Sequence, residues 1–387
     1  MKKSLLALAV LSAVAGSASA QSSVTMYGIM DAGIVHESGN PKGSVTKLTS
    51  GVTAGSRLGF RGVEDLGGGV AAVFLLETGI TIDTGGNAQG ASTGNPAGTV
   101  FARQNFVGLK SNNGTLTMGR QYNPYFKTVA AVDPFGAGGE GNSGNVIAFT
   151  GANGRSNNSI LYVSPTFSGF SAELLYAFGE VTGDTKLGRV INGAVQYANG
   201  PLMVRAGFNH QNAAPGAPTA TAPAAVQFAA AQAAAATKNA VIAASYDLQV
   251  VKLSALYATV KGPSFTSATS GAVLVGFNAA AGMPYNPSFV PPPRADTRDF
   301  LLAATIPLGV SRVQLSYIDR KDKTVAAQDA KQMAIGYEYN VSKRTALYAQ
   351  FSHIKNDNGA AYTVGNAGDI TAGSGDKGYA VGVRHVF

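Results

Sequence analysis

The sequence predicts an all-β protein, a sixteen-stranded antiparallel transmembrane β-barrel. Three observations lead to this fold. Apolar and polar residues alternate with a period of two along most of the chain. Tight turns and long loops alternate between the strand segments, as the two ends of a transmembrane barrel require. The last segment, Tyr379–Phe387, runs to the chain terminus, so its edge needs a strand to pair with.

The first twenty residues have the pattern of an export signal. Lys2 and Lys3 precede an apolar run from Leu5 to Ala15, and small residues ending at Ala20 follow. This pattern is typical of a secretory signal peptide cleaved after a small residue. We therefore expect a signal peptide over 1–20 and a single barrel domain over 21–387.

The composition fits export and a membrane barrel. The chain holds 49 Gly, 18 Phe and 15 Tyr but only 13% charged residues and no cysteine, so disulfides cannot stabilise it. No run of about 18 apolar residues follows the signal, so no helix is expected to span a bilayer. The net charge is +8, or about +6 without Lys2 and Lys3, and the basic residues are not clustered. This favours a modest attraction for anions and no nucleic-acid partner.

The strands can be predicted in order along the chain. The first, Val24–His36, has an apolar or small face that includes Met26 and Ile34. The others are predicted over or around 56–62, 70–82, 101–110, 116–118, 158–163, 170–179, 189–197, 202–209, 240–246, 251–260, 300–306, 312–318, 332–339, 345–354 and 379–387.

The connections between these strands are of two kinds. Short turns are expected at sites such as Asn112-Asn113-Gly114 and Pro307-Leu308-Gly309, whereas long loops are expected over 38–51, 83–98, 123–154, 212–236 and 356–375 and between 260 and 295. The Ala- and Pro-rich segment 212–236 is interpreted as an external loop; a partner-binding segment is the alternative. Outer-membrane barrels have short periplasmic turns and long external loops, which fits this division.

The terminal strand predicts how the barrel closes. Tyr379, Val381, Val383, His385 and Phe387 share one face. Within lipid every backbone polar group must be paired inside the protein, so a spanning sheet has to close. The first strand, Val24–His36, is the expected partner. A barrel of about sixteen strands is wide enough for an aqueous channel.

Several segments together resemble the general porins of Gram-negative β-proteobacteria. They occur in the family's order over 21–387, and as a linked set they are far more specific than any one of them. The segments are Ser23–Gly33, Ser56–Gly67, Arg103–Leu109, Met118–Tyr122 and Val383–Phe387. The Ala-rich insertion at 212–236 departs from the common family pattern.

The resemblance implies a trimeric outer-membrane porin with a third external loop folded into the lumen. It also implies surroundings of outer-membrane lipid and lipopolysaccharide. Its solutes would be small hydrophilic molecules and inorganic ions. The terminal aromatic, Phe387, resembles the signal by which barrel-assembly machinery recognises its substrates. No cofactor is implied.

The loop expected to narrow the pore is 123–154, with Asp133 and Glu140 as its acidic residues. Alternation places Arg57 and Arg103 on the lumen side, the first opposite Leu58 and Phe60 and the second opposite Phe106. Arg155 and Arg61 are predicted to face the lumen as well, Arg61 nearer the periplasmic turn. The resemblance puts such arginines across from the acidic loop. The hypothesis is a transverse field with a weak to moderate anion preference.

Arg120 fails the same alternation test. It shares a face with Leu116 and Met118, which points it outward. Because an outward arginine is costly against lipid, a contact with a neighbouring subunit is expected there. A solvated charge at the rim of the barrel is the alternative for each arginine.

Catalysis and metal binding have little support in the sequence. The four histidines, His36, His210, His353 and His385, lack metal-ligand spacing, and no serine stands out as a nucleophile. Two alternatives to a general porin remain open. One is a substrate-specific channel, for which Tyr122, Tyr125 and Phe126 are too few to form an aromatic track. The other is a surface barrel that acts as an adhesin or phage receptor.

Overall fold

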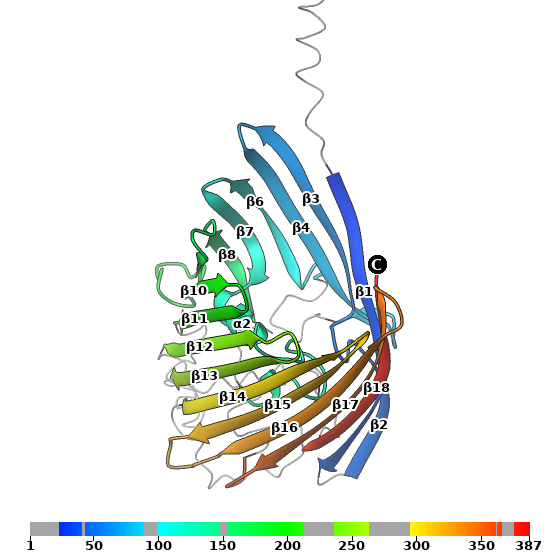
Figure 1. Ribbon diagram of the computed structural model, residues 1–387. Coiled ribbons are helices and arrows are strands. Elements are labelled where there is room, and N and C mark those ends of the chain that lie inside the picture. Colours follow the sequence, from blue (N-terminus) through cyan, green and yellow to red (C-terminus); the bar gives the residue numbers. More distant parts are fainter. Residues whose placement is uncertain are drawn as a thin grey trace, which may run out of the picture.

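The computed structural model describes residues 23–40, 43–88, 99–147, 154–212, 236–262, 295–360, 362–365 and 375–387. Within them the chain forms one continuous antiparallel wall of strands (Figure 1). The strands are β1 (Ser23–Asn40), β2 (Gly43–Ser50), β3 (Arg57–Gly67), β4 (Val70–Thr81), β5 (Gly86–Asn87), β6 (Gln104–Ser111), β7 (Gly114–Tyr122), β8 (Arg155–Val163), β9 (Phe170–Ala177), β10 (Val190–Asn199), β11 (Leu202–Gln211), β12 (Thr237–Asp247), β13 (Lys252–Gly262), β14 (Ala295–Leu308), β15 (Ser311–Asp322), β16 (Ala330–Asn340), β17 (Thr345–Asn356) and β18 (Lys377–Val386).

These eighteen segments occupy sixteen positions in the barrel, as the sequence predicts. The β2 and β3 segments are one strand interrupted at 51–56, because both pair with β1, at 32–40 and 23–29 respectively. The β5 segment has only two residues and pairs with the end of β4. Removing one interruption and one short segment leaves sixteen strands.

The first and last strands close the barrel. β1 pairs with β18 from Ile29↔Val386 to Ser38↔Lys377. Beyond β18 the backbones of Gly28 and Phe387 exchange two hydrogen bonds, with N–O distances of 3.0 and 3.1 Å. Pairing along both edges leaves no open edge at the seam, which confirms the closure predicted from Tyr379–Phe387.

The two faces of the wall differ in character. Outward side chains are large and apolar, as in Val24, Ile34 and Met333, which are 68%, 55% and 62% exposed. Inward positions include buried polar residues such as Asp31 and Gln332. A wall that is apolar outside and polar inside suits lipid on one side and water on the other.

One expected loop is a strand. The sequence predicted a loop over 38–51 because that segment is polar and rich in Gly, Ser and Thr, but 43–50 form β2 against β1. Val45 and Leu48 are the only large apolar residues of 43–50 and fall on opposite faces, so the composition of this strand resembles that of a loop. Most of the predicted external loop 212–236 lies outside the described residues, as do residues 1–20 of the predicted signal peptide.

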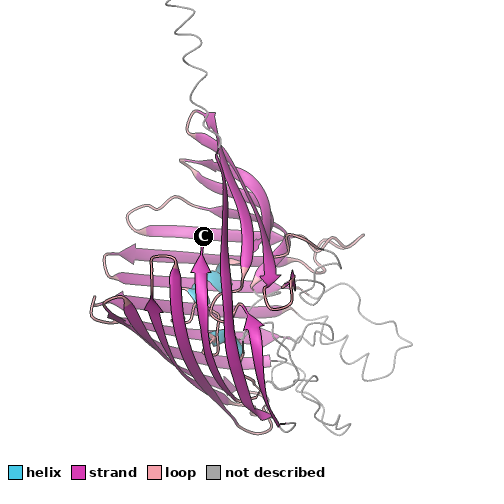
Figure 2. Cartoon of the chain, turned by 90° about the vertical axis from the view of Figure 1, so that its right-hand side faces the viewer, coloured by secondary structure: helices cyan, strands magenta, loops and turns pink. Residues whose placement is uncertain are grey.

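Two short helices lie after β7, inside the ring of strands (Figure 2). They are α2 (Pro124–Ala130) and the 3-10 helix η2 (Ser143–Asn145). Asn123 caps α2 by accepting a hydrogen bond from the backbone N–H of Phe126, and Pro124 occupies the first helical position. Among the described residues no helix is long and apolar enough to cross a bilayer.

Candidate functional site: the lumen and its basic clusters

The segment 123–147 runs inside the barrel and fills part of its lumen. Its helix α2 packs against β10, β11 and β12. Two polar contacts fix this position: the Tyr125 backbone N–H donates to Asn192 Oδ1 at 2.8 Å, and Arg205 Nε donates to Thr128 Oγ1 at 2.9 Å. Residues 148–153 of the expected 123–154 loop lie outside the described residues.

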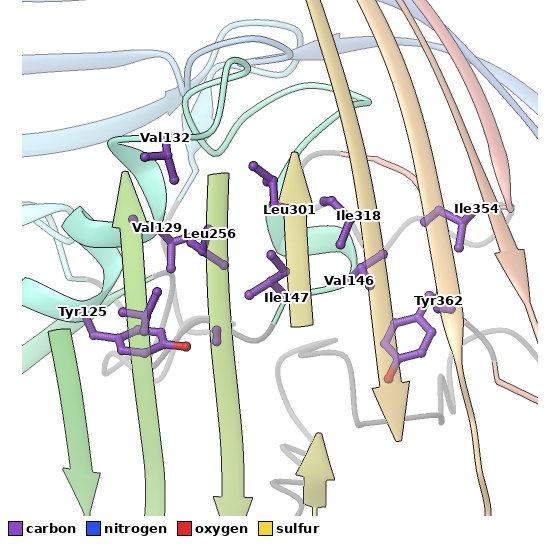
Figure 3. Packing of buried hydrophobic residues seen from close by; sticks show 14 of the residues in the cluster. Tyr125, Val129, Val132, Val146, Ile147, Leu256, Leu301, Ile318, Ile354 and Tyr362 are labelled. Atoms are coloured by element: carbon purple, nitrogen blue, oxygen red, sulfur yellow. The ribbon is translucent and has the colours of Figure 1, made fainter. Parts of the chain in front are cut away.

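An apolar cluster joins this segment to the inner wall (Figure 3). The segment contributes Tyr125, Val129, Val132, Val146 and Ile147, and strands β12 to β17 contribute Val241, Ala243, Leu256, Ala258, Leu301, Ile318, Ala330 and Ile354. All are nearly or fully buried. Apolar packing of this kind inside a barrel stabilises the segment against one side of the wall and leaves the rest of the lumen open.

A buried ion pair holds the C-terminal end of the segment 123–147 in place. Arg320 Nη1 donates to the Val146 carbonyl at 2.8 Å and pairs with Asp299 Oδ1 at 3.1 Å. Gln332 Nε2 donates to the carbonyls of Gly141 and Asn142 at 3.0 and 3.2 Å. The backbone of 141–146 is therefore held by side chains of the barrel wall, so its position is specified by the strands.

The open part of the lumen contains a cavity of about 940 Å³, bounded by 133–138 of the inserted segment, the 51–56 interruption and the inner wall. Its lining is rich in bases. The basic residues are Lys47, Arg57, Arg103, Arg155, Lys252, Arg312 and Arg384, and the acidic ones are Asp83, Asp133 and Glu338.

The first basic cluster contains Arg57, Arg103 and Arg155 around one acid, Glu77. Arg103 Nε lies 2.9 Å from Glu77 Oε1, and Arg57 Nη1 lies 3.8 Å from Glu77 Oε2. Arg103 and Arg155 both donate to the Tyr122 hydroxyl, and the Arg155 guanidinium stacks over the Tyr122 ring at 4.1 Å. Two of these three fixed cations, Arg57 and Arg103, pair with the one carboxylate, and Arg155 lies against Tyr122 beside them, which leaves a local excess of positive charge.

The second basic cluster contains Arg312 and Arg384 around Glu338, on β15, β18 and β16. Each arginine donates from Nη2 to a different oxygen of the Glu338 carboxylate at 2.9 Å. Neither this cluster nor Glu77 is predicted from the sequence. A usable signal existed, since Arg384 falls on the face of the last strand opposite Val381 and Val383. Only the strand register brings Arg384 within reach of Glu338, across β17.

Arg103 reaches the lumen for a different reason from the one predicted. The sequence predicts an outward Phe106, but Val107 and Leu109 are the exposed residues, at 60% and 52%, so Phe106 faces inward. That part of the prediction is wrong. Arg103 precedes the start of β6 at Gln104 and is not bound by the strand's alternation, and its guanidinium turns in toward Glu77.

The two acidic residues of the inserted segment do not form the expected opposing wall. The Asp133 carboxylate accepts backbone N–H groups of Phe135, Ala137 and Ser143 at 2.9–3.2 Å and forms no ion pair within the described part of the chain. Burial raises the pKa of Asp133, and these hydrogen bonds act against that rise. Glu140 is also buried. Its Oε2 lies so close to Gly378 that a β-carbon added at this glycine would be 1.9 Å from that oxygen.

Arg61 also faces inward but does not line the cavity. Its guanidinium lies 5.5 Å from the centre of the Tyr27 ring, two same-face positions along β3 from Arg57 and its cluster. The Arg61 side chain is exposed, so it is a solvated base beside the cavity.

Arg120 lies on the outer face, opposite Asn105 on β6. Its Nε donates to the Ala102 carbonyl at 2.6 Å, and Nη1 donates to Asn157. Its Nη2 is buried and has no hydrogen-bond partner within the described residues. The side chain sits in an outer groove of about 600 Å³ together with apolar residues such as Leu76 and Met118. The groove therefore holds a charged group and three asparagines, Asn105, Asn157 and Asn158, beside the apolar residues of the outer wall.

An apolar outer wall and a lumen that holds a basic cavity beside the inserted segment 123–147 define a transmembrane diffusion channel. The chain belongs to the Gram-negative porin family, whose model matches residues 7–359. It is an outer-membrane porin, as the sequence motifs predicted.

Individual relatives support the same assignment. The chain is similar to outer membrane porin protein 32 of Delftia acidovorans, with 36% identity over the full length of both chains. It is 33% identical to an outer membrane porin protein of Bordetella pertussis, over 92% of this chain and 95% of that one.

Solved structures agree on the fold. An anion-selective porin from Comamonas acidovorans matches with a TM-score of 0.71 and 32% identity, over 95% of this chain and all of the other. A trimer form of OmpT from Vibrio cholerae matches with a TM-score of 0.61 at 14% identity, which is a likeness of fold alone.

Proposed function

We propose that this porin lets small hydrophilic solutes and inorganic ions diffuse passively across the outer membrane and that it prefers anions. The observation that carries the preference is the charge balance in the lumen: the first cluster has three arginines and one carboxylate, Glu77, and the second has two arginines that share Glu338. Both clusters line the same cavity. The likeness to a porin of Comamonas acidovorans that is described as anion-selective supports the proposal.

The physical basis is a fixed positive potential in a narrow aqueous space. Guanidinium groups stay protonated under ordinary conditions, so the clusters do not lose charge near neutral pH. One uncompensated charge changes the energy of an ion 7 Å away by about 0.6 kcal/mol in water, which is about a threefold change in occupancy. A few such charges produce a moderate preference without blocking passage.

Reversal potentials in a salt gradient across a planar bilayer test this proposal. The wild type is expected to favour chloride over potassium. The double variant Arg57→Ala/Arg103→Ala is expected to lose much of that preference. Lys343→Ala/Arg344→Ala is the matched control, because it removes two bases from an exposed turn that does not line the cavity. Cation selectivity of the wild type, or equal effects of the two double variants, would contradict the proposal.

The roles of the chain's segments follow from the same function. Residues 1–20 act as the signal peptide, 21–387 as the single barrel domain, and 123–154 as the constriction loop. Residues 212–236 form an external loop. Arg61 supplies a further positive charge next to the constriction, and Asp133 and Glu140 hold the constriction loop in place through their buried carboxylates.

The assembled protein is a homotrimer in which the Arg120 groove faces a neighbouring subunit. Burying an unpaired guanidinium donor against lipid would cost about 2–4 kcal/mol at mid-membrane, and a protein neighbour removes that cost. Arg120→Ala is expected to lower the temperature at which trimers dissociate in native gels while the monomeric barrel stays folded. The other contacts of the trimer are outer-membrane lipid and lipopolysaccharide.

A further inference from the structure

The interruption between β2 and β3, residues 51–56, projects into the lumen. Its apolar residue Val52 is 1% exposed and packs with Val35, Tyr348 and Ala380 on the inner wall. Gly51 adopts φ of +70°, the left-handed region that favours glycine, where the chain leaves β2. We call residues 51–56 the inner kink. It bounds the same cavity as the constriction segment.

One buried carboxylate organises the inner kink. Asp31, on β1, is 0% exposed. Its Oδ2 accepts the backbone N–H groups of Thr53 and Ala54 at 3.0 and 2.8 Å and the Thr53 hydroxyl at 2.5 Å. Its Oδ1 accepts the Tyr348 hydroxyl at 2.6 Å. A carboxylate with four donors is strongly held, so it fixes the kink in one conformation.

The inner kink in turn contacts both basic clusters. The Gly55 carbonyl accepts Arg57 Nε at 2.8 Å, and a β-carbon at Gly55 would lie 2.9 Å from Arg103 Nη1. In the second cluster, Arg384 Nη1 donates to the Thr53 hydroxyl at 3.3 Å. The kink therefore touches three of the five arginines that set the charge of the lumen.

The inner kink also meets the constriction segment directly. A β-carbon at Gly138 would lie 2.3 Å from the Thr53 carbonyl oxygen, so only glycine permits the two backbones to approach this closely. The passage is thus limited by two elements in contact, the segment 133–138 and the kink.

We propose that the inner kink is a second constriction element and that Asp31 is its positioning residue, holding Arg57 and Arg384 where they set ion selectivity. The proposal rests on the anion preference proposed above. Loss of the Asp31 carboxylate frees Thr53 and Ala54, widens the passage and lets both guanidinium groups move away from the path of the ions.

The test compares two variants that each remove one buried negative charge from β1. In Asp31→Asn we expect a higher single-channel conductance and an anion-to-cation permeability ratio about twofold lower than in the wild type, the size of effect produced by moving a charge a few ångströms in water. Glu37→Gln is the matched control. Glu37 is equally buried and pairs with Lys47 at 3.0 Å, away from the kink.

The sign of the change separates positioning from simple charge. Removing a negative charge by itself raises the anion preference, so Glu37→Gln should keep or raise the permeability ratio. Equal shifts of the same sign in Asp31→Asn and Glu37→Gln would overturn the positioning role. A wild type without anion preference would instead overturn the proposed selectivity, so the two failures can be told apart.

Two further variants keep the test decisive if Asp31→Asn does not assemble. Thr53→Val keeps the backbone donors to Asp31 but removes the hydroxyl that Arg384 contacts, and it should lower the permeability ratio in an assembled channel. Gly138→Ala should force the kink and the constriction segment apart and change the conductance. Wild-type selectivity in Thr53→Val together with wild-type conductance in Gly138→Ala would contradict the proposal.

Discussion

The Arg103 guanidinium donates from Nε to Glu77 Oε1 at 2.9 Å, on the inner wall of the channel. The other carboxylate oxygen accepts the Tyr27 hydroxyl at 2.9 Å and faces Arg57 at 3.8 Å. Glu77 is therefore the counter-charge of the first basic cluster. It limits both the repulsion among the arginines and the positive potential that a passing anion meets.

Replacing Glu77 should strengthen the anion preference. Glu77→Gln removes the only carboxylate that pairs with Arg57 and Arg103 among the described contacts. The expected rise in the anion-to-cation permeability ratio is about threefold, from the energy of one unit charge near 7 Å in water. Reversal potentials in a salt gradient measure it.

The control for this prediction is Glu180→Gln, in an exposed loop where Glu180 accepts a hydrogen bond from Asn158. It removes the same charge from the protein but not from the cavity. A fall in the ratio for Glu77→Gln would show that the carboxylate matters for holding the arginines in place more than for its charge.

Replacing Asp133 should change stability more than selectivity. Its carboxylate accepts three backbone N–H groups within its own loop, and their dipoles offset much of its field across the passage. In Asp133→Asn the new amide N–H₂ group faces backbone N–H donors and cannot accept hydrogen bonds from them. Each hydrogen bond lost should lower the free energy of unfolding by about 1–3 kcal/mol.

The measurements are the reversal potential and the thermal unfolding of the refolded protein. The midpoint of unfolding should fall while the permeability ratio stays within the range of the Glu180→Gln control. A selectivity change as large as that of Glu77→Gln would restore the transverse-field hypothesis drawn from the sequence.

The barrel was predictable because its determinants are local. Alternation along strands such as Val24–His36 and the terminal run Tyr379–Phe387 reports which side chains face lipid, and closure follows from the need to pair every backbone group in lipid. The strand β2 is not predicted because its two large apolar residues, Val45 and Leu48, fall on opposite faces, so the segment has no apolar face to recognise.

The ion pairs of the lumen were not predictable to the same degree. Glu77 pairs with Arg103 and Glu338 with Arg384 through the register of neighbouring strands, and a single sequence does not state that register. The direction in which a loop carboxylate points is harder still to predict. Asp133 could face the arginines or its own backbone, and the choice depends on the turn at 133–137, where Gly136 and Ala137 have φ of +64° and +59°.

The buried pair Arg320–Asp299 should control how firmly the constriction segment is held. Removing one partner of a buried pair leaves an uncompensated charge, which costs about 3–5 kcal/mol. In Arg320→Met the carbonyl of Val146 also loses its donor. We expect a lower unfolding midpoint and noisier open-channel currents, both measurable on the purified protein.

The double variant Asp299→Leu/Arg320→Met separates the effect of the ion pair on stability from the effect of Arg320 on the position of Val146. Two apolar residues in place of the pair should recover most of the stability. The current noise should persist, because Val146 still lacks its donor. Quiet currents in the double variant would mean that the apolar cluster alone, including Val146 and Ile318, holds the segment.

The C-terminal residue should matter for assembly in the membrane. Phe387 extends the seam by exchanging backbone hydrogen bonds with Gly28, and a β-carbon at Gly28 would lie 2.3 Å from the Phe387 ring. Together with the resemblance of the terminal aromatic to the signal read by barrel-assembly machinery, this predicts that deleting Phe387 lowers the amount of folded barrel in the outer membrane. Export and signal cleavage should be unchanged. The amount of folded barrel, export and signal cleavage are measured by fractionation and by heat-modifiable mobility in gels.

Tyr379→Ala is the matched control, since it removes an outward aromatic from the same strand but leaves the terminus intact. Normal assembly of the Phe387 deletion would remove the terminal residue from any recognition role, whereas an equal defect in Tyr379→Ala would assign the effect to the outer aromatic face of β18.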